Sequence, residues 1–149
     1  MNSIEAEIDD YLDRYAATLT SFDAPAAADL WGRPGMILND QQGAGVLESR
    51  EAMVRGLEQS YPLYRELGLA SVGYERLSHT PLSETIVLVR VRWLFYDEDG
   101  AQLTDSFASY IVRRGEEGLR AYVCVPEDDL EKLQALATEK GIDLFGGTP

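Results

Sequence analysis

The chain has 149 residues, and its 26 acidic and 13 basic side chains give a formal net charge of −13 at pH 7. This length is typical of one domain, and 45% hydrophobic residues are enough for a buried core. The negative charge repels phosphate groups, so we expect no binding to nucleic acid or to an anionic membrane surface. Charge of this sign favours neutral or cationic ligands.

The cysteine and histidine content and the first residues of the chain further limit the kinds of site and the compartment that we expect. Cys124 is the only cysteine, which leaves no internal disulfide and no cysteine cluster for zinc. One histidine and scattered carboxylates lack the spacing of metal ligands, and no glycine-rich phosphate loop follows a strand, so we expect neither a metal nor a cofactor. Residues 1–20 lack the apolar run of a signal peptide and no stretch is long enough to span a membrane, so we expect a cytoplasmic protein.

The N-terminal residues have the periodicity of two helices. Apolar side chains recur every three or four residues over 3–20, which predicts an amphipathic helix. A second, short helix is expected to follow, with Asp23 as its N-cap, Pro25 in its first turn and its end near Gly32.

Two further helices are expected later in the chain. Ser49 is expected to cap the first of them, and Pro62 should kink or break it about one turn before Gly68. One face of this helix carries Val54, Leu57, Tyr61 and Tyr64. The last helix is expected over residues 126–141, with acidic residues at its start and Gly141 at its end.

The remaining sequence is mostly of β type. Strands are expected at residues 36–39, 70–79, 85–96, 103–113 and 119–125, with a return strand beginning at Val46. Residues 85–96 give the strongest signal, because β-branched and aromatic side chains occupy both of their faces. The turn after them ends at Gly100, which suits a positive φ.

The order of the elements indicates the fold class. The chain is expected to form helices first, then a long antiparallel meander and then one helix. This order is typical of an α+β fold. We expect a cone-like curved antiparallel sheet packed on the N-terminal helices over residues 1–126, with a C-terminal helix and tail, residues 127–149, in the same domain. The sheet face away from the helices is also apolar and needs a cover. A second subunit is the simplest cover and predicts a homodimer through the sheet face, and the C-terminal helix is the alternative.

The stretch RYAATLTSFDAPAAADLW, residues 14–31, resembles the start of the ketosteroid isomerases, within the nuclear transport factor 2-like (SnoaL-like) superfamily. The shared residues are Arg14, Tyr15, Ala16, Ala17, Leu19, Asp23, Leu30 and Trp31. The order of elements also agrees with this superfamily over roughly residues 5–125. The segments SYIVRRGEEG and YDEDGA are similar to an uncharacterised bacterial branch, although Leu119 stands where its members usually have tryptophan.

The resemblance implies a proton-transfer site. Such isomerases use a carboxylate base beside a carbonyl, and neutral donors that bind the resulting oxyanion. Their donor tyrosine matches Tyr15, and their protonated aspartate falls on Tyr110, whose hydroxyl is also a neutral donor. Their base falls on Asn39 by direct counting, or on Asp40 if the preceding segment carries one extra residue. An amide cannot serve as the base, so Asp40 is the candidate.

Each candidate also has a structural interpretation. Tyr15 shares a helical stripe with apolar residues and Tyr110 alternates with apolar residues in a strand, so both suit a core. Asp40 lies in a turn, where aspartate often makes local hydrogen bonds. His79 is a catalytic candidate because related dehydratases and cyclases use a histidine–aspartate pair, but its place beside Pro81 near a strand end favours a surface or rim role. Cys124 is expected to be an inert buried thiol.

Three functions remain open. The first is the binding of a small hydrophobic molecule in an apolar cavity that the cone encloses. The second is an isomerase, dehydratase or cyclase reaction on a hydrophobic carbonyl compound, with Asp40 or His79 as the base and Tyr15 as the oxyanion donor. The third is a non-catalytic dimeric module that associates through its sheet. The expected pocket residues are Tyr11, Tyr15, Trp31, Met53, Leu57, Trp93, Phe95 and Tyr110.

Overall fold

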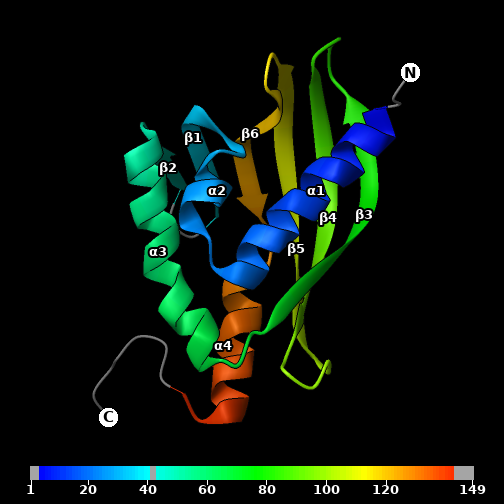
Figure 1. Ribbon diagram of the computed structural model, residues 1–149. Coiled ribbons are helices and arrows are strands. Elements are labelled where there is room, and N and C mark those ends of the chain that lie inside the picture. Colours follow the sequence, from blue (N-terminus) through cyan, green and yellow to red (C-terminus); the bar gives the residue numbers. More distant parts are fainter. Residues whose placement is uncertain (1–3, 41–42, 143–149) are drawn as a thin grey trace.

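The computed structural model describes residues 4–40 and 43–142 (Figure 1). Its helices are α1 (Ile4–Ser21), α2 (Ala24–Ala28), α3 (Arg50–Glu66) and α4 (Asp129–Lys140). Its strands are β1 (Trp31–Asn39), β2 (Gly43–Leu47), β3 (Ser71–Pro81), β4 (Ile86–Tyr96), β5 (Gln102–Gly115) and β6 (Gly118–Pro126). The strong apolar periodicities of the sequence therefore correspond to the long helices and to the central strands.

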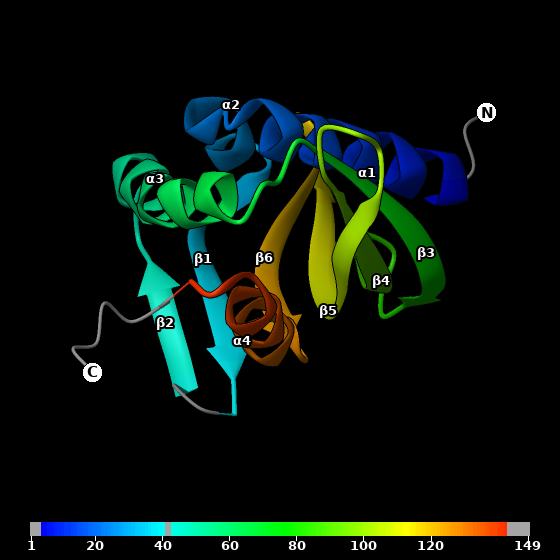
Figure 2. The same cartoon turned by 90° about the horizontal axis from the view of Figure 1, so that it is seen from below.

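The six described strands form one curved sheet in the order β2-β1-β6-β5-β4-β3. Helices α1, α2 and α3 lie on its concave side (Figure 2). The α+β cone expected from the order of elements is confirmed. One pairing differs from a purely antiparallel sheet, because β1 runs parallel to β6. β1 follows the N-terminal helices, and β6 is the last strand of the meander. β6 lies beside β1 and runs in the same direction.

The second helix is shorter than expected. It ends at Ala28, and Trp31 already belongs to β1, although the helix was expected to continue to Gly32. Trp31 pairs with Ala121 of β6, whose backbone N–H donates to the Leu30 carbonyl at 3.0 Å. Strand pairing with a segment far along the chain thus overrides the local helical preference of these residues.

Helix α3 is longer than expected, because it continues through Pro62 to Glu66. Proline cannot donate to the carbonyl one turn earlier, which belongs to Glu58. Pro62 and Glu58 are both exposed, so water can satisfy that carbonyl. Gly68 follows the helix with a φ of 92°, a conformation that favours glycine.

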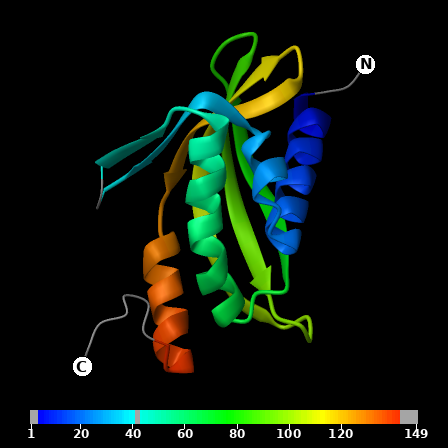
Figure 3. The ribbon, with the colours of Figure 1, turned by 60° about the vertical axis from the view of Figure 1, so that its left-hand side comes forward.

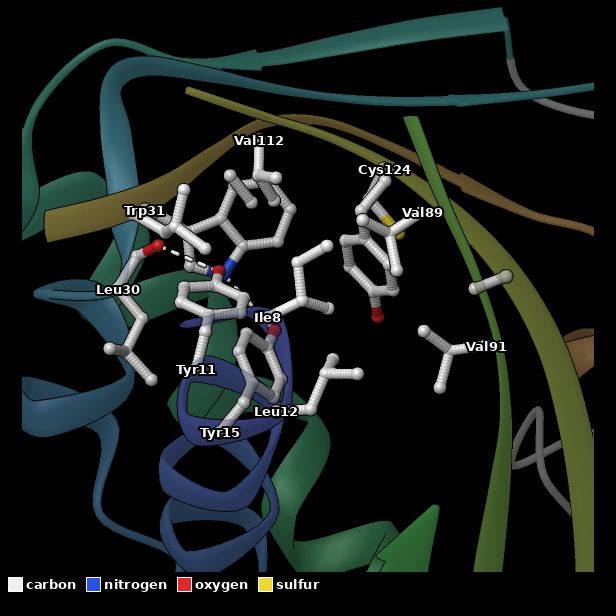
Figure 4. Packing of buried hydrophobic residues seen from close by; sticks show 14 of the residues in the cluster. Ile8, Tyr11, Leu12, Tyr15, Leu30, Trp31, Val89, Val91, Val112 and Cys124 are labelled. Atoms are coloured by element: carbon white, nitrogen blue, oxygen red, sulfur yellow. Dashed lines mark hydrogen bonds between the residues drawn. The ribbon is translucent and has the colours of Figure 1, made fainter. Parts of the chain in front are cut away.

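The core lies between α1 and the concave face of the sheet (Figure 4). The buried apolar side chains of α1 include Ile8, Tyr11, Leu12 and Tyr15, and the inward side chains of β4 are Val87, Val89, Val91 and Trp93. Full burial of each large apolar side chain contributes about 1.5–3 kcal/mol to folding. This packing places the Tyr15 ring 5.5 Å from the Trp93 ring, measured between ring centroids.

Helix α4 follows β6 and packs beside β5 and on the end of α3 (Figure 3). Its buried residues Leu136 and Ala137 contact the cluster around Leu67. Lys132 of α4 pairs with Asp105 of β5, which ties the helix to the sheet. The expected C-terminal helix therefore packs on the elements of the cone rather than across its convex face.

The convex face of the sheet is largely apolar. Strand register places these side chains on it: Met36, Ile86, Leu88, Ile111, Val123 and Val125. None of these six belongs to either core cluster that the described residues form. The homodimer through this face, expected from the sequence, therefore stays a prediction.

Light scattering at micromolar concentration is expected to give a dimer mass, about twice the 16.6 kDa of the chain. Leu88→Arg should give a monomer, because it places an unpaired charge in the apolar contact. Glu58→Arg, on the exposed side of α3, is the matched control and should remain a dimer. A monomeric wild-type protein would contradict this arrangement.

Candidate functional site

A cavity of about 650 Å³ lies between the concave face of the sheet and helices α1, α3 and α4. The expected residues Tyr15, Trp31, Met53, Leu57, Trp93, Phe95 and Tyr110 all line it. Five of the described elements contribute to this group, so only the folded cone brings these side chains together. A mostly apolar cavity of this size can enclose a drug-sized molecule.

Two tyrosine–tryptophan pairs form one end of the cavity. The Trp31 indole N–H donates to the Tyr15 hydroxyl at 3.0 Å, and the Trp93 indole N–H donates to the Tyr110 hydroxyl at 2.9 Å. The two tyrosine rings lie 6.2 Å apart between centroids. Because an indole is only a donor, each tyrosine oxygen accepts in these bonds, and the Tyr110 hydroxyl also makes a hydrogen bond with the Cys124 thiol. We call these four residues the tyrosine end.

Electrostatics keep the tyrosine end neutral. Burial is the main cause that raises the pKa of Tyr15 and of Tyr110, and the nearby Cys124 thiol raises both further. Burial likewise raises the pKa of Cys124 to about 12. All three groups are therefore protonated at physiological pH. Two neutral O–H donors in an apolar space suit an uncharged oxygen acceptor such as a carbonyl.

Tyr11 does not have its expected place in the pocket. It is 2% exposed and is not among the residues that line the cavity. Its hydroxyl donates to the Leu30 carbonyl at 2.8 Å, as Figure 4 shows. Tyr11 and Tyr15 do lie on one buried face of α1, as expected. Tyr11 is one turn earlier in the helix, however, and lies behind the cavity wall. It ties α1 to the segment before β1.

Asp40 is also not at the cavity. It is exposed in the turn after β1 and is not among the described residues that line the cavity. Asn39, the other position for a base, pairs with Gly43 at the end of the hairpin and does not line the cavity either. The hairpin of β1 and β2 extends past the helices (Figure 3), and from its end Gly43 and Ala44 line the cavity, whereas Asn39 and Asp40 do not. Neither Asn39 nor Asp40, the two positions that the resemblance to the isomerases offers for the base, therefore places a carboxylate beside Tyr15.

His79 contacts α1 rather than the rim of the cavity. Its Nδ1 atom lies 3.1 Å from a guanidinium nitrogen of Arg76, and its Nε2 atom lies 3.8 Å from the Glu5 carboxylate. Arg76 also pairs with Asp9 at 3.0 Å. These contacts hold β3 against α1, which covers the concave side of the sheet there. His79 is not among the residues that line the cavity.

Charged residues of β5 and α4 also line the cavity, in a part that we call the α4 end. They are Asp105 of β5 and Asp129 and Lys132 of α4. Asp105 lies five residues before Tyr110, or about 16 Å along an extended strand. The sequence pattern does not reveal these residues as part of the cavity, because the contact of α4 with β5 depends on the turn after β6. Four further residues line the cavity and were not among the expected pocket residues: Ser60, Tyr61, Tyr64 and Cys124.

The pKa of Asp105 makes the attachment of α4 dependent on pH. A hydrogen bond from Lys132 is the main cause that lowers this pKa, and a hydrogen bond from Arg92 at 2.6 Å lowers it further. A carboxylate whose pKa is lower in the folded state stabilises that state at neutral pH. This stabilisation is lost as the pH falls below the unfolded value of about 3.9 and through the lower folded value.

We therefore expect the wild-type protein to lose more free energy of unfolding between about pH 6 and pH 3 than Asp105→Asn loses. Urea unfolding at both pH values measures this difference. The variant should be the less stable protein at pH 6, because Lys132 and Arg92 lose the charge of their partner. Equal pH dependence in the two proteins would show that Asp105 does not stabilise the fold.

Two other kinds of site are absent from the described residues. In the part of the chain that the structure describes, no three His, Cys, Asp or Glu side chains converge as metal ligands. Within the same residues, no helix is both long and apolar enough to cross a membrane.

Residues 3–129 match the family described as NTF2-like protein (DUF6841). The chain belongs to this family. The superfamily expected from residues 14–31 is thereby confirmed, and the match extends over all six strands and into the start of α4. No curated protein matches the chain significantly.

Solved structures share the NTF2-like fold. A domain of unknown function with a cystatin-like fold from Nostoc punctiforme is 14% identical, with a TM-score of 0.68 over 97% of this chain and 91% of that one. A ketosteroid isomerase-like protein from Erwinia carotovora atroseptica is 14% identical, with a TM-score of 0.63 over 85% and 97%. A Catenulispora acidiphila protein in complex with S-DNPA is 18% identical, with a TM-score of 0.62 over 83% and 92%. Identities this low show a shared fold and no more.

Proposed function

We propose that this NTF2-like protein binds a small, neutral, hydrophobic molecule in the cavity of its cone. The ligand places an oxygen acceptor at the tyrosine end, where the hydroxyls of Tyr15 and Tyr110 donate to it. The single observation that carries this proposal is the pair of tyrosine hydroxyls in one apolar cavity, each of which accepts a hydrogen bond from a tryptophan N–H.

Charge and size support a neutral ligand. The raised pKa values of Tyr15 and Tyr110 keep both hydroxyls uncharged. The charged residues that line the cavity come from its α4 end, so an ionised group at the tyrosine end would have no counter-ion among them. The structure of the Catenulispora acidiphila protein in complex with S-DNPA supports the idea that this fold accommodates a small molecule.

An isomerase, dehydratase or cyclase reaction is the weaker alternative. It needs a base within hydrogen-bonding reach of the substrate. Asp40 and His79, the two expected bases, do not line the cavity. The tyrosine hydroxyls supply donors for binding, which favours a binding protein over a proton-transfer enzyme.

Thermal melts with a matched pair of probes test the proposal. We expect 9-fluorenone, a neutral ketone, to raise the melting temperature by a few degrees, and the related 9-oxofluorene-2-carboxylate to leave it unchanged. Ala108→Phe is the control, because Ala108 lines the cavity and a larger side chain there fills it. An equal effect of both probes, or an undiminished effect in Ala108→Phe, would refute the proposed site.

A further inference from the structure

The hydroxyl of Tyr61 is a buried polar group for which residues 4–40 and 43–142 provide no hydrogen-bond partner. Tyr61 lies on α3, lines the cavity and is 3% exposed. Of the side-chain polar atoms buried within residues 4–40 and 43–142, only this hydroxyl and Nε of Arg114 have no hydrogen-bond partner. Leaving a buried hydroxyl unsatisfied costs stability, so native proteins satisfy such groups with protein, water or ligand.

The neighbouring hydroxyls of the cavity differ from that of Tyr61. Ser60 donates to the Leu57 carbonyl at 2.9 Å, and Tyr15 and Tyr110 accept from tryptophans. Tyr61 is held by its ring alone, which packs edge-on against Phe22 with the centroids 5.2 Å apart. Packing therefore fixes the ring and leaves its hydroxyl free to donate.

The surroundings of Tyr61 favour a neutral acceptor. Burial, with smaller effects from the Asp23 and Glu58 carboxylates, raises the pKa of Tyr61 to about 12, so it stays a donor. Tyr15, Tyr61 and Tyr64 all line the same cavity. An anionic group bound to Tyr61 would be repelled by the two carboxylates.

We propose that Tyr61 is a second polar anchor in the cavity and that the ligand carries two neutral oxygen acceptors. One acceptor binds to the Tyr15 and Tyr110 hydroxyls, and the other binds to the Tyr61 hydroxyl. The inference rests on the proposed binding function and narrows its ligand class to largely hydrocarbon molecules with two carbonyl or ether oxygens. A molecule with a single oxygen would leave Tyr61 without a partner.

The protein contains its own reporter for the test. Trp31 and Trp93 are the only two tryptophans, and both line the cavity, so quenching of tryptophan fluorescence follows its occupation. Two probe pairs differ by one carbonyl and cover two oxygen separations. They are 5α-androstan-17-one with 5α-androstane-3,17-dione, and 4-benzoylbiphenyl with 1,4-dibenzoylbenzene. Each pair is titrated into wild type, Tyr61→Phe and the control Tyr122→Phe, whose ring packs on Gly32 outside the cavity lining.

We expect wild type to bind at least one diketone about fivefold more tightly than its matched monoketone, as one further hydrogen bond implies. In Tyr61→Phe this preference should disappear, while in Tyr122→Phe it should persist. The melting temperature of ligand-free Tyr61→Phe should equal or exceed that of wild type, because no satisfied hydrogen bond is lost.

Three results would overturn the inference. They are equal affinity of wild type for both members of both pairs, an unchanged preference in Tyr61→Phe, and a clear fall in the melting temperature of ligand-free Tyr61→Phe. The last result would show that the hydroxyl already has a partner, such as an ordered water. If no probe quenches the wild-type protein at all, the proposed binding function itself fails. Monoketone binding without a preference refutes only the second anchor.

Discussion

Replacement of Trp93 by alanine is expected to lower the free energy of unfolding by about 3–5 kcal/mol, the usual cost of removing a buried tryptophan. Trp93 is 4% exposed, and its ring packs against Tyr15, Tyr74 and Tyr110 at centroid distances of 5.5, 6.2 and 6.2 Å. Its loss removes contacts with α1, β3 and β5 at once. Urea unfolding followed by circular dichroism measures the change.

Trp93→Phe separates the two contributions of this residue. Phenylalanine keeps an aromatic ring in the core but removes the N–H that donates to Tyr110. We expect it to cost about 1–3 kcal/mol, less than alanine. An alanine variant that loses less than about 1 kcal/mol would show that the ring packing around Trp93 does not hold the sheet to α1.

The double variant Tyr15→Phe/Tyr110→Phe is expected to weaken binding of a neutral ketone such as 9-fluorenone by more than tenfold. Each hydroxyl supplies about 1 kcal/mol as a donor, or roughly fivefold in affinity, and two together approach thirtyfold. Fluorescence titration at a temperature well below the melting transition measures the dissociation constant. The variant should also be somewhat less stable, because the N–H groups of Trp31 and Trp93 lose their acceptors.

Tyr11→Phe is the matched control for this loss of hydroxyls. Tyr11 is as buried as Tyr15, and its hydroxyl also makes one hydrogen bond, but it does not line the cavity. It should therefore lose a similar amount of stability and keep the wild-type affinity. If Tyr11→Phe weakens binding as strongly as the double variant does, the effect comes from general destabilisation and the tyrosine end is not the site.

The sequence predicted the architecture because its longest elements carry strong periodic patterns. The apolar stripe of residues 3–20 and the β-branched residues of 85–96 correspond closely to α1 and β4. Trp31 was assigned to the wrong element, since its strand exists only by pairing with β6. Local propensity carries no information about such a distant partner.

The candidate site was predicted only in part. Tyr15 and Trp93 were found because helical spacing and strand alternation place them on inward faces. Trp31 was also expected at the pocket, although it was assigned to the wrong element. Asp40 was the expected base, but it is exposed in the turn after β1 and does not line the cavity, which counting along a strand does not reveal. Tyr61 was assigned to the correct helix face, but its unpartnered hydroxyl depends on how α3 packs against Phe22 after α1, which sequence spacing does not encode.

Native mass spectrometry of the protein with the neutral probes 9-fluorenone and 5α-androstane-3,17-dione tests the central claim most directly. The claim predicts that the wild-type chain takes up one molecule per chain and that Ala108→Phe, with its cavity filled, takes up none. A wild-type chain that carries no small molecule and takes up neither probe, or an Ala108→Phe variant that takes up as much as wild type, would contradict a ligand-binding cavity.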